Sequence, residues 1–567
     1  MKDGISITGA GIICAIGNDR ASVLGSLRKK ESGVRGVKYL ETVHGELPVG
    51  EVQLSNDEMK TMLGLPSDTS VSRTSLMGAL AIRQALNQAG IERIGDRKVV
   101  LISGTTVGVM DVTEMEYHRN KSVLNVRDLP KGNECGKSTA QMAALAGLEN
   151  VELCTVSTAC SSALNSIIVG AEMLRHSEAD IVIAGGSEAL SRFHLNGFNT
   201  LMILDGRRCR PFDAGREGLN LGEGAAFVVL QKDAERPLAY VSGYANRCDA
   251  FHQTASSENG EGAFLAMTQA LESAGLKPSD IDYVNAHGTG TPNNDLSESR
   301  ALTRVFGKDM PPVSSTKGFT GHTTSASGAI ETVICLLAMQ NGVVPANLGW
   351  AETAPGLVVP SKGSENVVMD NVMCNSFGFG GNDSSLVLSR CSHASDTEMP
   401  GNGDCEVMAE VTVDSADSLA ELRNYVPPME SRRMCTLMKA SLLSSLRALE
   451  ISGIGCPDAI IAATSEGMLE TSCQFLQDIE DNDEAMLKPT LFMMSTHNTV
   501  ASAIAIRLGC HGYNITYSQG DASSQWAMRD ARRLIADGKA ASVLVTSFDE
   551  SPDGSFRSES TVLRKKL

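Results

Sequence analysis

The sequence predicts an α/β protein, because strand-like and helix-like runs alternate along the chain and a part of this pattern occurs twice. Between Met1 and about Arg390, short apolar runs are separated by stretches in which apolar residues recur at helical spacing. The strand-like runs include Lys98–Ile102, Ile181–Ala184 and Ala225–Leu230, and the helix-like runs include Ser75–Ala89 and Ser161–Leu174. Such alternation is typical of sheets covered by helices on both faces.

The composition excludes several classes of protein. The 567 residues carry a formal net charge of −18, which argues against nucleic acid as a partner, because nucleic-acid binders normally present basic surfaces. No apolar run approaches the ~20 residues of a membrane span. The 14 cysteines include no CxxC pair, a pattern typical of reduced thiols rather than of disulfides or a zinc site. We therefore expect a cytoplasmic protein with no membrane partner.

A polar segment divides the chain into two parts. Residues 392–404 contain glycine and proline between polar side chains, which predicts a linker. The main domain would then cover residues 1–391, and a C-terminal domain would cover residues 405–567. A length of 567 residues suits two or three domains.

The C-terminal region repeats part of the main domain. Ser157–Ser162 (STACSS) and Ser518–Ser523 (SQGDAS) lie 361 residues apart, and at this offset Glu188 matches Asp549. A nearly constant offset over more than eighty residues predicts a second copy of the first half of the main domain. The copy carries Asp521 where the main domain has a cysteine, and we expect this aspartate to be the N-cap of the following helix.

The first chemistry-bearing motif is Thr155–Ser162, TVSTACSS. A β-rich segment ends in small residues, and Cys160 then stands at the start of a helix. Backbone N–H groups and the helix dipole at such a position favour a thiolate, while small neighbours leave room for a ligand. The alternative is a buried and inert cysteine, which is the usual fate of a lone cysteine in a core.

The second motif is Val284–Pro292, VNAHGTGTP, and it places His287 beside two glycines. A loop of this kind leaves space for a ligand, and the hydroxyls of Thr289 and Thr291 can bind a polar ligand arm. A core or loop-capping histidine is the alternative reading.

The third motif is Ser314–Glu331, SSTKGFTGHTTSASGAIE. Lys317 and His322 lie five residues apart, and Glu331 lies inside the helix that follows. An ion pair between Lys317 and Glu331 would compensate two buried charges and fix the loop. The alternative is a solvated loop charge.

The fourth motif is Asn375–Asp383, NSFGFGGND. Its glycines permit backbone conformations in which amide groups face a reacting oxygen. The motif lacks the spacing of a dinucleotide-binding loop, so we do not expect a nucleotide there.

Together these motifs identify a resemblance over about Met1–Arg390. The sequence resembles the elongating β-ketoacyl-acyl-carrier-protein synthases, which are condensing enzymes of the thiolase fold; Arg210–Asp213 (RPFD) and Leu221–Ala225 (LGEGA) are also typical of that family. The resemblance implies a layered α/β/α/β/α main domain with halves at about 1–235 and 236–391. It implies an acyltransferase that needs no cofactor and no metal.

The resemblance also assigns roles to residues. It implies Cys160 as the nucleophile, His287 and His322 as the decarboxylation pair, and Lys317 with Glu331 as a supporting pair. The backbone N–H groups of Cys160 and Phe379 would form the oxyanion hole, and Phe379 would be the gating aromatic residue. One departure from the family pattern lies beside it, because Asn382–Asp383 stands where Thr–Asn is usual.

The implied reaction is a decarboxylative Claisen condensation. An acyl group on the cysteine combines with malonyl-acyl-carrier-protein to give 3-oxoacyl-acyl-carrier-protein, in fatty-acid synthesis or in the synthesis of polyenes of the aryl polyene or flexirubin kind. A thiolase would need a second cysteine, and an initiating synthase would carry asparagine in place of His322. A partner or chain-length subunit would lack the cysteine, and a Cys/His/His metal site suits the glycine-rich loops poorly.

The resemblance extends to partners. Residues from about Cys405 resemble a truncated, chain-length-factor-like ketosynthase domain, a half-thiolase-like α/β unit. It would either complete an intramolecular pseudo-dimer or leave the chain to form a homodimer. Relatives line their acyl pockets at the positions of Val107 and Met110. The acyl carrier protein is acidic in this family, and its candidate docking residues are Arg119, Lys121, Arg207 and Arg208.

Overall fold

The computed structural model describes residues 4–120, 134–392 and 404–566. The predicted linker at 392–404 lies, apart from its two end residues, outside the described residues, and so does Lys121. Among the described residues, no helix is long and apolar enough to cross a membrane.

The first half of the main domain alternates strands and helices as the periodicity predicts. Its elements are β1 (Ile5–Cys14), α1 (Arg20–Lys29), α2 (Asn56–Leu63), α3 (Arg73–Gln88), β2 (Val99–Gly104), α4 (Met110–Asn120), α5 (Cys135–Ala146), β3 (Glu152–Val156), α6 (Ser162–Arg175), β4 (Ile181–Glu188), α7 (Arg192–Thr200) and β5 (Gly224–Lys232).

The second half of the main domain follows without interruption. Its elements are β6 (Ala239–Cys248), α8 (Glu261–Ala274), β7 (Tyr283–Asn285), α9 (Pro292–Phe306), β8 (Val313–Ser314), α10 (Lys317–Thr320), α11 (Ser327–Asn341), β9 (Asn371–Gly378) and β10 (Asn382–Ser389).

The C-terminal half again alternates strands and helices. Its elements are β11 (Cys405–Val413), α12 (Pro428–Ser431), α13 (Thr436–Ser452), β12 (Ala459–Ala463), α14 (Leu469–Asp481), α15 (Pro489–Ser495), α16 (Thr499–Leu508), β13 (Tyr513–Tyr517), α17 (Ser523–Ala536), β14 (Ser542–Glu550) and β15 (Phe556–Lys565).

The strands of all three parts join into one sheet of 15 strands among the described residues. Their order is β11-β15-β14-β12-β13-β3-β2-β4-β5-β1-β6-β10-β9-β7-β8, so each part contributes five neighbouring strands. The group β13-β12-β14-β15-β11 has the same order and strand directions as the group β3-β2-β4-β5-β1. The repeat predicted from the constant offset is therefore present in the fold.

Two helices form the inner layer of the main domain because they are apolar nearly all round. All of α6 except two residues is buried, and α11 is buried from Ser327 to Met339. A helix without a polar face is stable only when it is covered on all sides. These two helices pack on each other and on the strands, and they carry the elbow of Cys160 and the side chain of Glu331.

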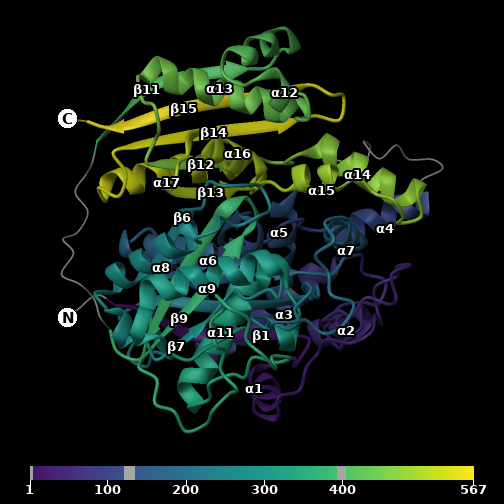
Figure 1. The fold of residues 1–567 in the computed structure, drawn as a ribbon, viewed down its shortest axis with the longest axis vertical. Helices are drawn as coiled ribbons and strands as arrows, with labels where there is room; N and C mark the ends of the chain where they lie inside the picture. Colours follow the sequence, from purple (N-terminus) through teal and green to yellow (C-terminus); the bar gives the residue numbers. More distant parts are fainter. Residues whose placement is uncertain (1–3, 121–133, 393–403, 567) are drawn as a thin grey trace.

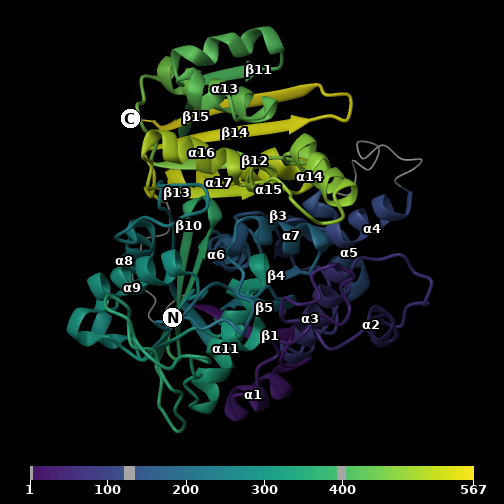
Figure 2. The same cartoon turned by 45° about the vertical axis from the view of Figure 1, so that its right-hand side comes forward.

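The C-terminal half stacks on one end of the main domain in both views of the molecule (Figures 1 and 2). The junction is an antiparallel contact between β13 and β3, where Tyr517 faces Val156. Two reciprocal backbone hydrogen bonds flank it, from Ser157 N to the carbonyl of Thr516 and from Ser518 N to the carbonyl of Thr155, each 2.9 Å long. Because Ser157 matches Ser518 and Thr155 matches Thr516 at the 361-residue offset, the offset exchanges these two bonds, and the two halves are related by a local twofold pseudosymmetry.

Charges across this junction are complementary. Glu172 on α6 pairs with Lys539 at 2.6 Å, and Glu178 pairs with Arg529 at 2.8 Å and with Arg533 at 3.3 Å. The acidic residues belong to the main domain and the basic residues to the C-terminal half. Lys539 matches Glu178 at the 361-residue offset, and Arg533 matches Glu172, so in a contact of two main domains through the same face each glutamate would meet the copy of the other.

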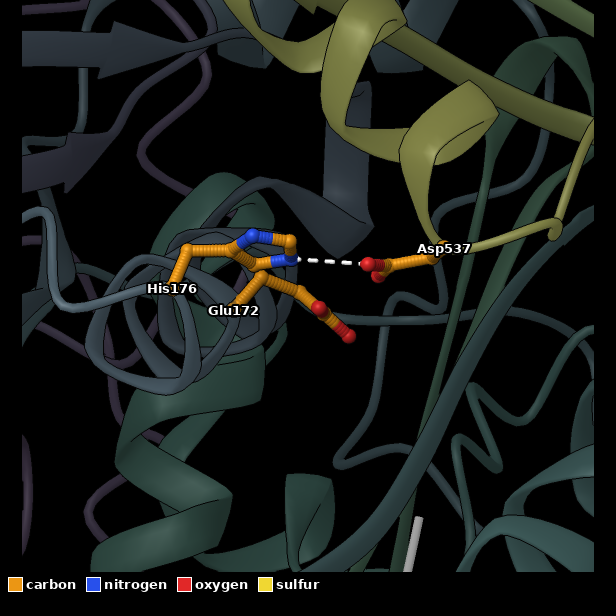
Figure 3. Close-up of side chains that lie close together, drawn as sticks. All are labelled: Glu172, His176 and Asp537. Carbon is orange, nitrogen blue, oxygen red and sulfur yellow. Dashed lines mark ion pairs between the residues drawn. The ribbon is translucent and has the colours of Figure 1, made fainter. Parts of the chain in front are cut away.

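A histidine and two carboxylates gather at the same junction (Figure 3). His176 Nε2 lies 2.9 Å from Asp537 Oδ1, and Glu172 lies beside them. The Lys539 ammonium contacts Glu172 at 2.6 Å and Asp537 at 3.0 Å. The protein's own lysine therefore compensates these carboxylates, and the cluster is an interdomain ion-pair network.

Candidate active site

Cys160 lies in a tight turn between β3 and α6. The turn is a 3₁₀ segment at Ala159–Ser161, and Ala159 has a left-handed backbone conformation with φ of +50°. Ser376 Oγ donates to the carbonyl of Cys160 at 2.9 Å, which ties the turn to β9. The strand-to-helix elbow that the sequence predicts is therefore present.

Burial governs the protonation state of the Cys160 thiol. The residue is only 5% exposed. This burial raises the pKa of the thiol to about 11, although the charge of Lys317 and the backbone N–H groups of Phe379 and Cys160 oppose the rise. The thiol is therefore protonated at neutral pH, and its attack on a thioester needs a base to take the proton. The same two N–H groups are the expected oxyanion-hole donors.

His322 is the imidazole beside this thiol. Its Nε2 lies 3.1 Å from Cys160 Sγ, and its Nδ1 lies 3.0 Å from Ser327 Oγ at the start of α11. Burial, and then the charge of Lys317, lowers the pKa of His322 well below its ordinary value, so the ring is neutral. Because the Ser327 hydroxyl can donate or accept at Nδ1, Nε2 can either accept the thiol proton or donate to an oxygen.

His287 faces His322 from the loop after β7, with the ring centroids 5.3 Å apart. Glu298 in α9 accepts hydrogen bonds from the backbone N–H groups of His287 at 2.8 Å and of Gly288 at 2.7 Å. Burial, and then the charges of Lys317 and His322, lowers the pKa of His287 well below its ordinary value. Two neutral imidazoles therefore face one space and can donate to the same carbonyl oxygen.

Lys317 and Glu331 form the ion pair that the sequence predicts. Lys317 Nζ lies 2.6 Å from Glu331 Oε1 and 2.5 Å from the carbonyl oxygen of His287. Burial raises the pKa of Glu331 to about 6, and the charge of Lys317 opposes this rise. The pair holds the His287 loop by its carbonyl group and places a positive charge near both histidines, which favours their neutral forms.

A cavity of about 340 Å³ connects these groups. Cys160, His287, His322, Thr289 and Thr291 all line it. The two threonine hydroxyls lie 2.9 Å apart, and both residues form part of the cavity wall. The structure thus brings together the three motifs that contain the cysteine and the two histidines.

Phe379 lies at the boundary between this cavity and an aromatic cluster. Its ring stacks on Phe198 with centroids 5.6 Å apart and planes 20° apart. Phe198 in turn packs on Phe492 of the C-terminal half, with centroids 5.5 Å apart. A movement of the Phe379 ring would therefore change the connection between the cavity and the cluster.

Val107 and Met110 lie in this cluster and not among the residues that line the cavity. Both are buried with Phe193 and Phe198, and α14 and α15 contribute Phe475 and Phe492 to the same cluster. The sequence-based expectation that these positions line an acyl pocket stays a prediction. It missed that the C-terminal half fills the far side of this region.

The expected docking residues occupy different environments. Arg207 pairs with Glu217 at 3.1 Å, Arg208 is exposed, and Arg119 is exposed at the end of α4. Leu201 and Ile203, close to Arg207 and Arg208 in the chain, line the cavity. The segment that carries these two arginines therefore begins at the cavity wall.

Several residues of the site had no signal in the sequence. Ser327 and Glu298 orient the two histidines, but both lie in ordinary helical sequence. The repeat showed that Glu188 matches Asp549, but the sequence did not show which hydrogen bonds these carboxylates accept. Glu188 accepts from Thr105, and Asp549 accepts from Thr464 at the equivalent turn.

The expectation for Asp521 is wrong. Asp521 lies inside a 3₁₀ turn at Gly520–Ala522, its side chain is exposed, and α17 begins only at Ser523. The N-cap position is held by Ala522, without a side-chain cap, and the Ser523 hydroxyl accepts a hydrogen bond from Gln519 N, 2.8 Å away in the preceding turn. The helix starts one residue later than an aspartate cap at position 521 would require.

Comparisons with known proteins identify the family of this chain. The family model described as "Beta-ketoacyl synthase, N-terminal domain" matches residues 2–236, and "Beta-ketoacyl synthase, C-terminal domain" matches residues 238–351. A further model described as "Beta-ketoacyl synthase, N-terminal domain" matches residues 409–562. The C-terminal half is therefore similar to the first half of the same fold.

Individual proteins show the same likeness. The chain is 33% identical to Nodulation protein E of Rhizobium meliloti (strain 1021), over 68% of this chain and 99% of that protein. It is 32% identical to 3-oxoacyl-[acyl-carrier-protein] synthase 2 of Coxiella burnetii, over 69% and 99%. Of the solved structures, the ishigamide ketosynthase/chain length factor is 30% identical and has a TM-score of 0.63, over 69% of this chain and 100% of that chain.

A second solved structure covers the whole chain. The PfaC Keto synthase-Chain length factor has a TM-score of 0.82 at 16% identity, over 100% of this chain and 78% of that chain. Together, the fold and the Cys–His–His cavity define a condensing enzyme of the thiolase fold. The chain belongs to the β-ketoacyl synthase family.

Proposed function

We propose that this chain catalyses the decarboxylative condensation of an acyl group on Cys160 with malonyl-acyl-carrier-protein, which gives 3-oxoacyl-acyl-carrier-protein. The observation that carries the proposal is the meeting of the Cys160 thiol with His287 and His322 in one 340 Å³ cavity. The carrier is supported by a relative that the chain matches over 99% of its length, 3-oxoacyl-[acyl-carrier-protein] synthase 2.

The first half-reaction is a thioester exchange. His322 Nε2, 3.1 Å from Sγ, takes the thiol proton as the sulfur attacks the acyl thioester. The N–H groups of Cys160 and Phe379 stabilise the negative oxygen of the tetrahedral intermediate. The carrier thiolate then leaves and takes up the proton, so the acyl group stays on Cys160.

The second half-reaction begins with the loss of carbon dioxide from the malonyl group. His287 and His322 donate hydrogen bonds to the malonyl thioester oxygen, which stabilises the enolate that remains. The enolate carbon attacks the acyl carbonyl, the bond to Sγ breaks, and the sulfur takes a proton from water. Neutral histidines suit this step, and burial beside Lys317 keeps the pKa of both low.

A partner or chain-length subunit without condensing activity is the alternative. Such a subunit would lack the nucleophile, whereas the main domain has Cys160 with both histidines beside it. The description does fit the C-terminal half, in which Asp521 occupies the equivalent turn.

We further propose that residues 1–391 form the condensing domain and that residues 405–567 replace a second subunit. The ranges of the three matched family models support this division. The β13–β3 junction and its complementary charges support an intramolecular pseudo-dimer. In the ishigamide structure the ketosynthase and the chain length factor are named together, which supports the same organisation here.

The acyl chain is best accommodated towards the aromatic cluster. Movement of Phe379 off Phe198 would open the cavity to the region of Val107 and Met110. Phe475 and Phe492 close the far side of that region and would limit the length of the chain. A fatty-acid or a polyene precursor fits this apolar environment.

The carrier protein would dock beside the cavity. Arg208 is exposed there, and Met202, 88% exposed, lies between the cavity-lining Leu201 and Ile203. An apolar side chain next to a basic one suits an acidic partner.

The test uses intact-protein mass and product analysis with acyl- and malonyl-carrier-protein thioesters. The wild type is expected to gain one acyl group and to form a 3-oxoacyl product, and Cys160→Ala should gain none. His287→Ala should still load but condense about 10²- to 10³-fold more slowly, because it loses one donor to the enolate oxygen. Equal loading by Cys160→Ala would contradict the assigned nucleophile. A wild type that loads without forming product would favour the partner-subunit alternative.

A further inference from the structure

The departure from the family pattern at Asn382 has a structural counterpart in the C-terminal half. Asn382 is fully buried at the start of β10, directly after the glycines of the Phe379 loop. Its Nδ2 donates to the carbonyl oxygen and to Oδ1 of Asn514, both at 3.0 Å. Asn514 lies on β13, so this buried carboxamide joins the two halves directly beside the oxyanion-hole loop.

Asn498 completes the connection from the C-terminal side. Its Nδ2 donates to the carbonyl oxygen of Phe379 at 2.9 Å and to Asn382 Oδ1 at 2.8 Å. Asn498 stands at the N-cap position of α16, where an asparagine side chain normally accepts from its own helix, yet it makes no such bond here. Its Oδ1 is buried and accepts no hydrogen bond from the described residues. Donation to the Phe379 loop therefore accounts for the orientation of this side chain.

The contact fixes Phe379 on both sides of its Cα. The Phe379 N–H points at Cys160 Sγ, and its carbonyl is held by Asn498. The following residue, Gly380, has a φ of +84°, and a Cβ there would lie 2.0 Å from Ser502 Oγ on α16. The glycine loop and α16 are thus in close contact, and the loop depends on the other half for its conformation.

The same network reaches the turn that carries the nucleophile. Asn514 N donates to Asn246 Oδ1 at 2.9 Å, and Asn246 Nδ2 donates to Asn165 Oδ1 at 3.0 Å. Asn165 Nδ2 then donates to Thr158 Oγ1 at 2.9 Å, two residues before Cys160. All five asparagines are at most 4% exposed. In such a buried network each carboxamide fixes the next one, because an unpaired partner is costly.

We propose that Asn498 is a positioning residue, through which the C-terminal half holds the Phe379 N–H in the oxyanion hole of the main domain. This inference rests on the proposed function of the Cys160 site. It gives the C-terminal half a role in the reaction itself, apart from any effect on chain length.

The test compares two reactions of the same sulfur in the full chain. Acylation by the octanoyl thioester of N-acetylcysteamine passes through an oxyanion, whereas alkylation by iodoacetamide does not. In Asn498→Ala, acylation of Cys160 is expected to fall about 10²-fold, whereas alkylation should fall much less, because it loses only the effect of the Phe379 N–H on the pKa of the thiol. Asn498→Ser should show the same split and remain folded, because serine is a good N-cap for α16 but too short to reach Phe379.

Thr546→Ala is the matched control. Thr546 is a fully buried residue of the same half, on β14, and its hydroxyl bonds to Ser560 away from the junction. This variant should lose stability in thermal unfolding and yet acylate like the wild type. The inference is overturned if a folded Asn498→Ser acylates like the wild type, or if acylation and alkylation fall together. A wild type that takes up no acyl group overturns the proposed function, and this inference with it.

Discussion

The turn at Cys160 and the turn at Asp521 have nearly the same backbone and opposite surroundings. Ala159 has a φ of +50°, and its counterpart Gly520 has a φ of +54°. Each of them is the first residue of a one-turn 3₁₀ segment. Cys160 is 5% exposed under the loops of His322 and Phe379, whereas Asp521 is exposed. The repeat thus preserves the turn, and the reactive environment comes from the second half of the main domain, which the C-terminal copy lacks.

The side-chain hydrogen bonds next to the two turns are also preserved. Glu188 accepts from Thr105 Oγ1 at 3.0 Å, and Asp549 accepts from Thr464 Oγ1 at 2.8 Å. In each half the same threonine oxygen then accepts from a glycine N–H, from Gly108 at 3.0 Å and from Gly467 at 2.9 Å. This local network belongs to the fold and persists where the chemistry is lost.

Moving the cysteine from the first turn to the second tests most directly whether the turn alone supports the reaction. In Cys160→Ala combined with Asp521→Cys, acyl loading should stay at least about 10³-fold below that of the wild type, because position 521 is exposed and lies outside the cavity that His287, His322 and Phe379 line. Intact mass after incubation with acyl-carrier-protein measures this, with Cys160→Ala alone as the control. An acyl adduct at position 521 would show that the turn suffices for reaction.

The relation between the halves predicts the size of the particle. If the C-terminal half occupies the place of a second subunit, β3 is already paired and the chain should remain a monomer of 60.0 kDa. Light scattering at several protein concentrations measures the mass. A value twice as large would contradict the simple pseudo-dimer and would place the C-terminal half outside an ordinary homodimer interface.

The smallest expected effects, on stability and on the acylation rate, come from substitution of Glu188 and Asp549, the two carboxylates that match in the repeat. Glu188→Gln and Asp549→Asn should each lower the free energy of unfolding by about 1–3 kcal/mol, because a neutral carboxamide accepts more weakly than a carboxylate from the donors of each turn. Only Glu188→Gln should also slow acylation, since Glu188 accepts from Ser325 near His322. Urea unfolding and the acylation rate measure the two effects. Equal slowing in both variants would mean that the distant turn is coupled to the site.

The sequence predicted the residues whose surroundings are local. Cys160, His287, His322 and Phe379 each lie in a short motif of glycines and small polar residues, and such motifs mark close backbone approaches. Their meeting in one cavity confirms that the motifs form one site, while their catalytic roles remain proposals.

Residues that act through long-range contacts gave no such signal. Asn498 occupies an ordinary position at a helix start, and its partners Phe379 and Asn382 lie in another part of the chain. Asp521 was wrongly predicted to be an N-cap because an aspartate before a helix suggests one, whereas the 3₁₀ turn inherited from the repeat delays the helix to Ser523.

The sequence by itself determined the order of strands and helices, the repeat and the chemistry of the side chains, because periodicity and motif composition act over short distances. The tertiary structure decided which of these groups share a space. It buried the thiol and the two histidines beside Lys317, which set their protonation states, and it placed the C-terminal half against β3 and the Phe379 loop. Burial and contact between distant segments depend on the packing of the whole chain, and no short stretch of sequence contains that information.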